Sequence, residues 1–207
     1  IDNIKDFIAR FFSKRVDHFL TVNSGVAQIY RDRFNVNPKR MTSCTHLGVD
    51  VDTFSPDYSN KKQDYIDKFS LSRGDQLVGY CGRLVEYKGV SDLIDAVSML
   101  RDDGIDCNLA LLGDGPMRKS LETLSLKYSW LYILDPIPHR EVVDFYRAID
   151  IFVMPSRVLP WHIEHDAHAL LEAMSVEVPC IATRCGALED VLPWNELLVD
   201  PENVYDL

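Results

Sequence analysis

Short apolar runs alternate with amphipathic stretches along most of this chain, and no other feature constrains the fold as strongly. The runs that predict strands are 18–22, 41–45, 76–81, 108–112, 131–134, 151–154, 180–183 and 197–199. The stretches with helical periodicity are 25–34, 90–100, 116–127, 141–148 and 167–175. Strands that alternate with helices at this spacing predict βαβ units, and therefore a mainly parallel sheet covered by helices on both faces.

The alternation also suggests how the chain is divided. From residue 74 to residue 207, six predicted strands with intervening helices fit one α/β domain, a Rossmann-like doubly wound parallel sheet. Residues 51–73 are polar, contain Pro56 and interrupt the rhythm, which is typical of an interdomain linker. Residues 1–50 supply only two strands and two helices, so we interpret them as the tail of a preceding domain.

Charge and cysteine usage exclude several classes of protein. The 207 residues carry 22 basic and 32 acidic side chains, a formal charge of −10. This balance argues against a nucleic-acid binder, which needs basic groups to displace counterions from phosphates. The five cysteines form no CxxC pair, so we expect reduced thiols and a cytoplasmic location. No apolar run approaches the roughly 18–20 residues of a membrane span.

The residues that directly follow the predicted strands are candidates for binding, because ligands of open α/β sheets lie beyond the carboxyl ends of the strands. Gly82 and Arg83 follow the run 76–81, and Lys88 comes just before a predicted helix. A helix N-terminus with two nearby cations favours an anion such as phosphate, although a solvated loop has the same composition. Gly113 and Gly115 follow the next run, a weaker signal that is more often a simple turn.

A second candidate region follows the run 151–154. Glu164 and Glu172 are separated by seven residues, and a helix is expected to start near Ala167. Carboxylates accept hydrogen bonds from sugar hydroxyls, and the free amides of Ala167 and His168 suit a phosphate. The rival interpretation is a zinc or iron site, since His162, His165 and His168 lie among carboxylates. No metal motif such as HExxH is present, so we expect no metal.

The ordered set of motifs resembles the C-terminal half of retaining GT-B glycosyltransferases of family 4, the glycogen-synthase-like group. The motifs that carry the resemblance are Gly82-Arg83-Leu84 with Lys88-Gly89, Gly113-Asp114-Gly115-Pro116, Asp150 to Ser156, Glu164-x7-Glu172-Ala173-Met174, Pro179, and Gly186 with Glu189. Upstream, Val22-Asn23-Ser24 and Gly48-Val49-Asp50 are similar to the end of the family's acceptor domain and its crossover.

The resemblance implies a role for each matched residue. Arg83 and Lys88 would bind the diphosphate of a nucleotide-sugar donor and stabilise the leaving group, with no metal or other cofactor. Glu164 would hold the donor sugar, and Glu172 the ribose. The remaining donor-binding positions would be Gly82, Gly113, Gly115, Ile137 near the base, and the backbone of Asp166, Ala167 and His168.

This sequence departs from the family pattern at three places. His165, Asp166 and Ala167 replace the usual Gly-Phe-Gly-like residues, and the loop from Ser156 to Glu164 is longer than usual and carries Pro160 and Trp161. Both departures lie at the donor-sugar end, where a change of substrate would place them. The third departure, Glu177 in place of a small residue, has no functional explanation from the sequence.

The expected function is therefore sugar transfer from a nucleotide-diphosphate-sugar to a sugar, glycolipid or protein acceptor. The bulk of the acceptor domain and the C-terminal helices of the family are expected to be missing, so this piece should be inactive alone. The alternatives are a nucleotide-sugar epimerase or phosphorylase on the same scaffold, or a receiver-like regulatory domain. The basic amphipathic stretch 8–20 suits an anionic membrane surface, but packing on the missing domain is the favoured interpretation.

Overall fold

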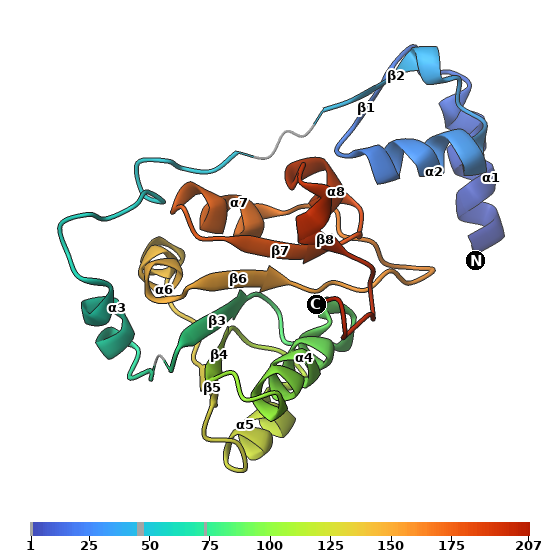
Figure 1. Cartoon of the computed structure of the whole chain (residues 1–207). Coiled ribbons are helices and arrows are strands. Elements are labelled where there is room, and N and C mark those ends of the chain that lie inside the picture. The colour runs from blue at the N-terminus through green and yellow to red at the C-terminus, as the bar shows by residue number, and fades with distance from the viewer. Residues whose placement is uncertain (1, 45–47, 73) are drawn as a thin grey trace.

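A six-stranded sheet forms the centre of the protein (Figure 1), whose computed structural model describes residues 2–44, 48–72 and 74–207. Its strands are β3 (Gln76–Cys81), β4 (Cys107–Leu112), β5 (Leu131–Leu134), β6 (Ile151–Met154), β7 (Cys180–Thr183) and β8 (Leu198–Val199). All neighbours pair in parallel, in the order β5-β4-β3-β6-β7-β8. The strand order reverses between β3 and β6, and such a switch point opens a binding crevice at the carboxyl ends.

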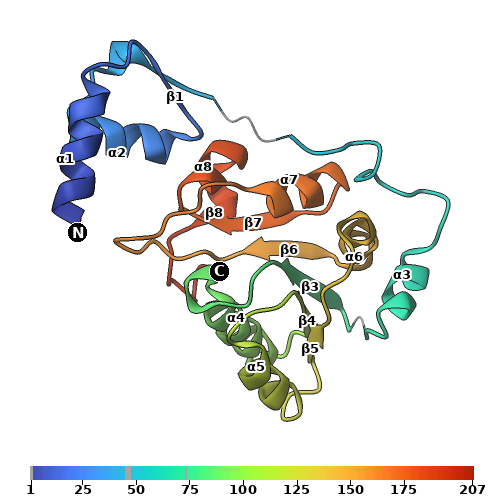
Figure 2. The same ribbon diagram turned by 180° about the vertical axis from the view of Figure 1, so that it is seen from behind.

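Helices cover both faces of this sheet (Figure 2). One face carries α4 (Val90–Asp102) and α5 (Arg118–Ser125), and the other carries α3 (Lys62–Lys68), α6 (Val142–Ala148), α7 (His168–Ser175) and α8 (Ala187–Val191). Successive strand residues point to opposite faces, so Leu77 belongs to the core under α6 and Val78 to the core under α4. This confirms the α/β class with a doubly wound parallel sheet.

Three-residue helical turns complete the domain. They are η2 (Glu86–Lys88) before α4, η3 (His139–Glu141) before α6, and η4 (Asn195–Leu197) before β8. Two of them, η2 and η3, lie at the carboxyl edge of the sheet and carry side chains into the candidate site.

The segment expected to be a linker is partly structured. It contains α3, and its Phe54 and Ile66 are buried in the core beside α6. Lys68 Nζ pairs with Asp144 Oδ2 on α6 at 2.7 Å. Residues 51–72 therefore contribute apolar side chains to the core of the sheet as well as linking the two parts of the chain, which their polar composition did not predict.

The N-terminal residues form a separate unit, drawn in blue in Figure 1. It consists of α1 (Asp2–Ser13), β1 (Phe19–Thr21), α2 (Ser24–Phe34), η1 (Pro38–Arg40) and β2 (Met41–Ser43), and β1 pairs with β2 in parallel. The expected strand 41–45 ends earlier, and residue 45 lies outside the described residues. The start of α2 touches the sheet domain, because Ser24 N donates to Asp190 Oδ2 at 2.7 Å.

The apolar side chains of α1 face outward. Phe7 is 70% exposed and Phe12 is 58% exposed, while Ser13 at the end of the helix is buried. Among the described residues, no helix is long and apolar enough to cross a membrane.

Candidate donor-binding site

The loops after β3 and β4 are pressed together at the carboxyl edge of the sheet. Leu84 N donates to Asp114 O at 2.9 Å, and Met117 N donates to Leu84 O at 3.1 Å. A Cβ atom at Gly113 would lie 1.9 Å from the carbonyl oxygen of Gly82, so no larger residue fits. A Cβ atom at Gly115 would likewise lie 2.4 Å from Leu84 O, so the close approach explains the glycines of the second loop and brings the candidate residues Gly82, Gly113 and Gly115 together.

An open groove of about 360 Å³ lies against these two loops. It is lined by Cys81, Gly82, Arg83, Leu112, Gly113, Asp114, Pro136, Ile137 and Val142. Ile137 thus shares the groove with Arg83, although 54 positions separate them in the chain. Burial raises the pKa of the Cys81 thiol to about 12, so Cys81 is an uncharged thiol at neutral pH.

Lys88 and Glu164 form a largely buried ion pair. The Lys88 ammonium lies 2.7 Å from each oxygen of the Glu164 carboxylate, and Ser156 Oγ donates to Glu164 Oε2 at 2.7 Å. The turn after Lys88 depends on Gly89, whose φ of 68° is left-handed and whose Cβ would lie 1.9 Å from Pro155 O. The loops after β3 and β6 therefore meet at this pair, on the two sides of the switch point.

Arg83 stands outside this pair. Its side chain is exposed, and its guanidinium donates a long hydrogen bond of 3.3 Å to the Tyr87 hydroxyl. The backbone beneath it is fixed, because the buried Tyr80 hydroxyl donates to Arg83 O at 2.9 Å. Arg83 thus presents its charge to the groove from a rigid loop, with most of its donors available.

Glu172 lies deeper, on α7. Its Oε2 accepts from the buried Tyr146 hydroxyl at 2.9 Å, and its Oε1 lies 2.7 Å from His139 Nε2. Burial raises the pKa of Tyr146 well above its usual value, so this phenol remains a proton donor. The His139 side chain is 73% exposed, and its ring lies against Phe54 with the two centroids 5.1 Å apart.

The start of α7 supplies unpaired backbone amides. The helix begins at His168, and Ala167 makes no side-chain cap. Within the described residues, the amides of Asp166, Ala167 and His168 donate no hydrogen bond. The preceding carbonyl of His165 accepts from Asn23 Nδ2 at 3.1 Å, so the N-terminal unit holds this loop in place.

The histidines near Glu164 are not arranged as a metal site. His168 Nδ1 lies 3.4 Å from Asp166 Oδ1, but throughout 2–44, 48–72 and 74–207 no group of three or more His, Cys, Asp or Glu side chains is placed to hold a metal ion. Metal independence of the reaction stays a prediction.

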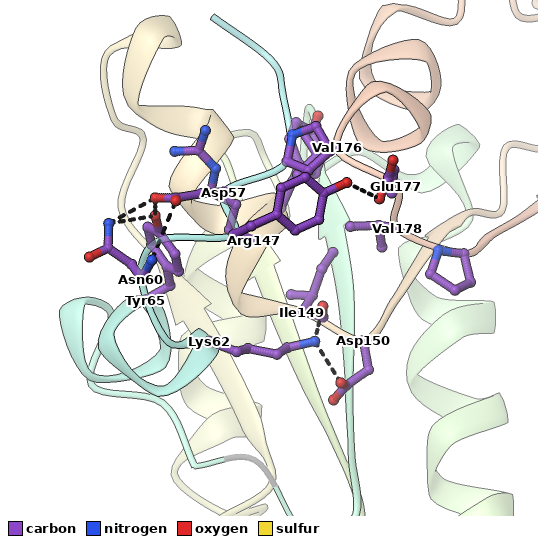
Figure 3. A pocket seen from close by; sticks show the side chains of 14 residues that line it. Asp57, Asn60, Lys62, Tyr65, Arg147, Ile149, Asp150, Val176, Glu177 and Val178 are labelled. Atoms are coloured by element: carbon purple, nitrogen blue, oxygen red, sulfur yellow. Dashed lines mark hydrogen bonds and ion pairs between the residues drawn. The ribbon is translucent and has the colours of Figure 1, made fainter.

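Glu177 has a structural role at the opposite edge of the sheet, beside a cavity of about 240 Å³ (Figure 3). It follows α7 with φ +64°, and its carboxylate accepts from the Tyr58 hydroxyl at 2.8 Å. Lys62 pairs with Asp150 at 2.6 Å on the other side of this cavity. Asp150 and Pro179 precede β6 and β7, so the cavity is at the amino-terminal edge, away from the donor-binding candidates.

Residues 61–207 match the family model described as glycosyl transferases group 1. The chain belongs to this family. The match gives no support to an epimerase, a phosphorylase or a receiver-like regulator.

Relatives of this group 1 glycosyl transferase chain agree with the assignment. A GDP-mannose-dependent α-(1-6)-phosphatidylinositol monomannoside mannosyltransferase of Mycolicibacterium smegmatis is 31% identical over 196 residues, covering 89% of this chain and 50% of the relative. The C-terminal domain of LpcC, a group 1 family protein of Francisella tularensis, has a TM-score of 0.63 at 27% identity, covering 76% of this chain and 82% of that one.

Anabaena HepE, solved in complex with UDP and glucose, has a TM-score of 0.73 at 16% identity, covering 92% of this chain and 51% of that one. The likeness at this identity concerns the fold. The chain spans between 30% and 50% of the length of the first curated relatives it matches.

Three side chains of the site had no role assigned from the sequence. Ser156 lies inside a quoted motif and Tyr146 lies in a predicted helix, but their bonds to the two glutamates depend on which loops meet. His139 gave no signal, because its partner Glu172 is 33 positions away on another element.

Proposed function

We propose that this chain is the donor-binding part of a retaining glycosyltransferase of family 4. The enzyme would transfer a sugar from a nucleotide-diphosphate-sugar to an acceptor. The observation that carries the proposal is the meeting of Arg83, the Lys88–Glu164 pair and the free amides before α7 at one switch point. Relatives named for GDP-mannose dependence and for a bound UDP support the donor class.

The chemistry follows from the charges. Cleavage of the sugar–phosphate bond leaves negative charge on the departing nucleoside diphosphate, and groups that bind this charge lower the barrier. Arg83 and Lys88 are the cations for this task, and the amides of Asp166, Ala167 and His168 add the partial positive charge of the α7 N-terminus. These groups supply what a divalent metal would otherwise provide, so we propose a reaction without metal or other cofactor.

The remaining parts of the donor have their own partners. Glu164 would accept hydrogen bonds from the sugar, and Glu172 would accept them from the ribose once His139 moves aside. The base would lie in the groove beside Ile137, against Gly82, Gly113 and Gly115. This order, from base to sugar, runs along the carboxyl edge from β4 to β6.

The acceptor would approach the donor sugar from the side of the loop 157–163 that faces α2. A cavity of about 620 Å³ lies there between α2 and the loop, with Gln28, Arg31 and Arg184 among its lining residues. Its size suits a sugar-sized acceptor group, carried by a sugar, a glycolipid or a protein. We expect the exposed apolar side chains of α1 to pack on further acceptor-domain residues. Because basic residues such as Lys5 and Arg10 lie among them, peripheral contact with a cytoplasmic membrane surface is the alternative.

Calorimetry with nucleotides tests the donor-binding role directly. We expect one of UDP, GDP or ADP to bind this chain in the presence of EDTA, and its sugar conjugates to bind more tightly. Absence of binding by all three diphosphates and their glucose and mannose conjugates would overturn the proposal. Retention is tested separately in a longer chain that includes the acceptor domain, by following the anomeric configuration of the first product by proton NMR.

A further inference from the structure

The loop between β6 and α7 is a tight hairpin fastened at both ends. Leu159 and His162 exchange two backbone hydrogen bonds of 2.8 and 3.0 Å, with Pro160 and Trp161 at the turn. At its start, Arg157 N donates to Tyr87 O at 2.9 Å, and its guanidinium binds the buried Asp92 of α4. At its end, Glu164 N donates to Cys185 Sγ at 3.4 Å. The loop therefore holds its side chains in defined positions.

Three aromatic rings pack together on this hairpin. The His162 ring centroid lies 4.2 Å from that of Tyr87, and the Trp161 ring meets Tyr87 edge-on at 5.5 Å. Such contacts stabilise by about 0.5–1.5 kcal/mol each. Tyr87 directly precedes Lys88, and His162 comes two positions before Glu164. The charges of Glu164 and Lys88 both act on the His162 ring, so the ring cluster lies near the ion pair.

One atom of this cluster lacks a partner. His162 Nε2 is buried and makes no hydrogen bond to any described residue. A buried polar atom without a partner destabilises a protein by about 1–3 kcal/mol, and native structures contain few of them. Burial lowers the pKa of His162, while the Glu164 charge opposes this. At neutral pH the ring is therefore uncharged, and Nε2 is either a donor or an acceptor according to its tautomer.

We infer that His162 determines which donor sugar is accepted, through a hydrogen bond between its Nε2 and one hydroxyl of the sugar held at Glu164. The inference rests on the proposed donor-binding role of the Lys88–Glu164 pair. A sugar hydroxyl both donates and accepts, so it matches either tautomer. A site with a buried polar group rejects an analogue that leaves this group unpaired, and His162 would give selectivity for the position and orientation of that hydroxyl.

The variant His162→Phe separates this role from packing, because phenylalanine keeps a ring against Tyr87 and removes both nitrogens. We expect the melting temperature to stay at or above the wild-type value, because the variant removes a buried nitrogen that has no partner, and the Kd of the nucleoside diphosphate to stay at the wild-type value. The Kd of the preferred nucleotide-sugar should rise at least ten-fold, and discrimination against its epimers and deoxy analogues should shrink. His18→Phe, in the N-terminal unit, serves as the matched control with unchanged affinities.

Each other outcome has a defined meaning. Wild-type affinity and selectivity of His162→Phe for nucleotide-sugars would overturn the inference, and so would an equal loss for diphosphate and nucleotide-sugar. Failure of the wild-type chain to bind any diphosphate or nucleotide-sugar would overturn the proposed function itself. The first two results leave the donor-binding role standing, so the two failures are distinguishable.

Discussion

The Lys88 ammonium lies 2.7 Å from both carboxylate oxygens of Glu164, although 76 positions separate the two residues in the chain. One is expected to bind the donor diphosphate and the other the donor sugar. Because they neutralise each other, Arg83 supplies the uncompensated positive charge beside them. The pair also joins the loops of β3 and β6, so each partner serves both the binding of a ligand and the stability of the protein.

Lys88 and Arg83 are therefore expected to differ in their effect on folding. Lys88→Ala leaves a buried carboxylate without its cation, and breaking a buried ion pair destabilises by about 3–5 kcal/mol. Arg83→Ala removes an exposed side chain and should change stability by less than about 0.5 kcal/mol. Both variants should weaken diphosphate binding more than ten-fold, the loss of a charge-assisted contact. Urea unfolding and calorimetry measure the two effects, and unchanged affinity in both variants would refute the phosphate assignment.

Variants of the two glutamates should distinguish contacts with the donor sugar from contacts with the nucleotide. Glu172→Gln is expected to weaken diphosphate and nucleotide-sugar alike, because the ribose is common to both ligands. Glu164→Gln should weaken only the nucleotide-sugar, by about ten-fold, since it keeps the side-chain volume and loses the charged acceptor. Calorimetry with matched ligands measures the difference. Equal losses for both ligands in both variants would show that the two roles are assigned wrongly.

Removal of divalent ions should leave donor binding unchanged. The positive charge that binds the diphosphate is expected to come from Arg83, Lys88 and the α7 N-terminus. EDTA dialysis should therefore change the Kd of the donor by less than two-fold. The metal content of the purified protein and the Kd before and after chelation check this. Stoichiometric zinc or iron that is lost together with donor binding would favour a metal site at the histidines instead.

The sequence predicted the sheet domain closely, because each buried strand has a continuous apolar run between turn residues. The runs 76–81, 131–134, 151–154 and 180–183 coincide with β3, β5, β6 and β7. The short helices α3 and α8, of seven and five residues, were missed. Helix α3 lies in a polar segment that was interpreted as a linker, and the five residues of α8 make little more than one turn.

The candidate site could be predicted from the sequence only in part. Glycine motifs predicted where the loops approach, but the bonds from Ser156, Tyr146 and His139 depend on tertiary contacts that no local pattern encodes. The hairpin at Leu159–His162 likewise depends on anchors from Asp92 of α4 and from Cys185, which follows β7.

Glu177 is expected to be a stability determinant that glycine would improve. Val178 N donates to Ala173 O and Glu177 N to Met174 O, which is a Schellman motif with Glu177 at its left-handed position. Glycine adopts this conformation without the strain of about 1 kcal/mol that other residues carry. Glu177→Gly should therefore raise the melting temperature by a few degrees, despite losing the exposed bond to Tyr58. Tyr58→Phe is the control for that bond and should lower stability by less than about 0.5 kcal/mol; a lower melting temperature of Glu177→Gly would contradict the account.

His162 should also give the protein a measurable loss of stability in mild acid. Burial lowers its pKa in the folded state, Lys88 and His165 act in the same direction, and Glu164 acts against them. The unfolded chain, with a pKa near 6.5, therefore binds the proton more readily than the folded protein. Stability is then lost as pH falls through about 6.5, and the loss grows until the folded-state pKa is passed. In His162→Phe this contribution is absent, so the free energy of unfolding should fall less between pH 7.5 and pH 5.5 than in the wild type. Urea titrations at both pH values measure this change in the free energy of unfolding. An equal change in the two proteins would contradict the prediction, because it would mean that the pKa of His162 is the same in the folded and unfolded states.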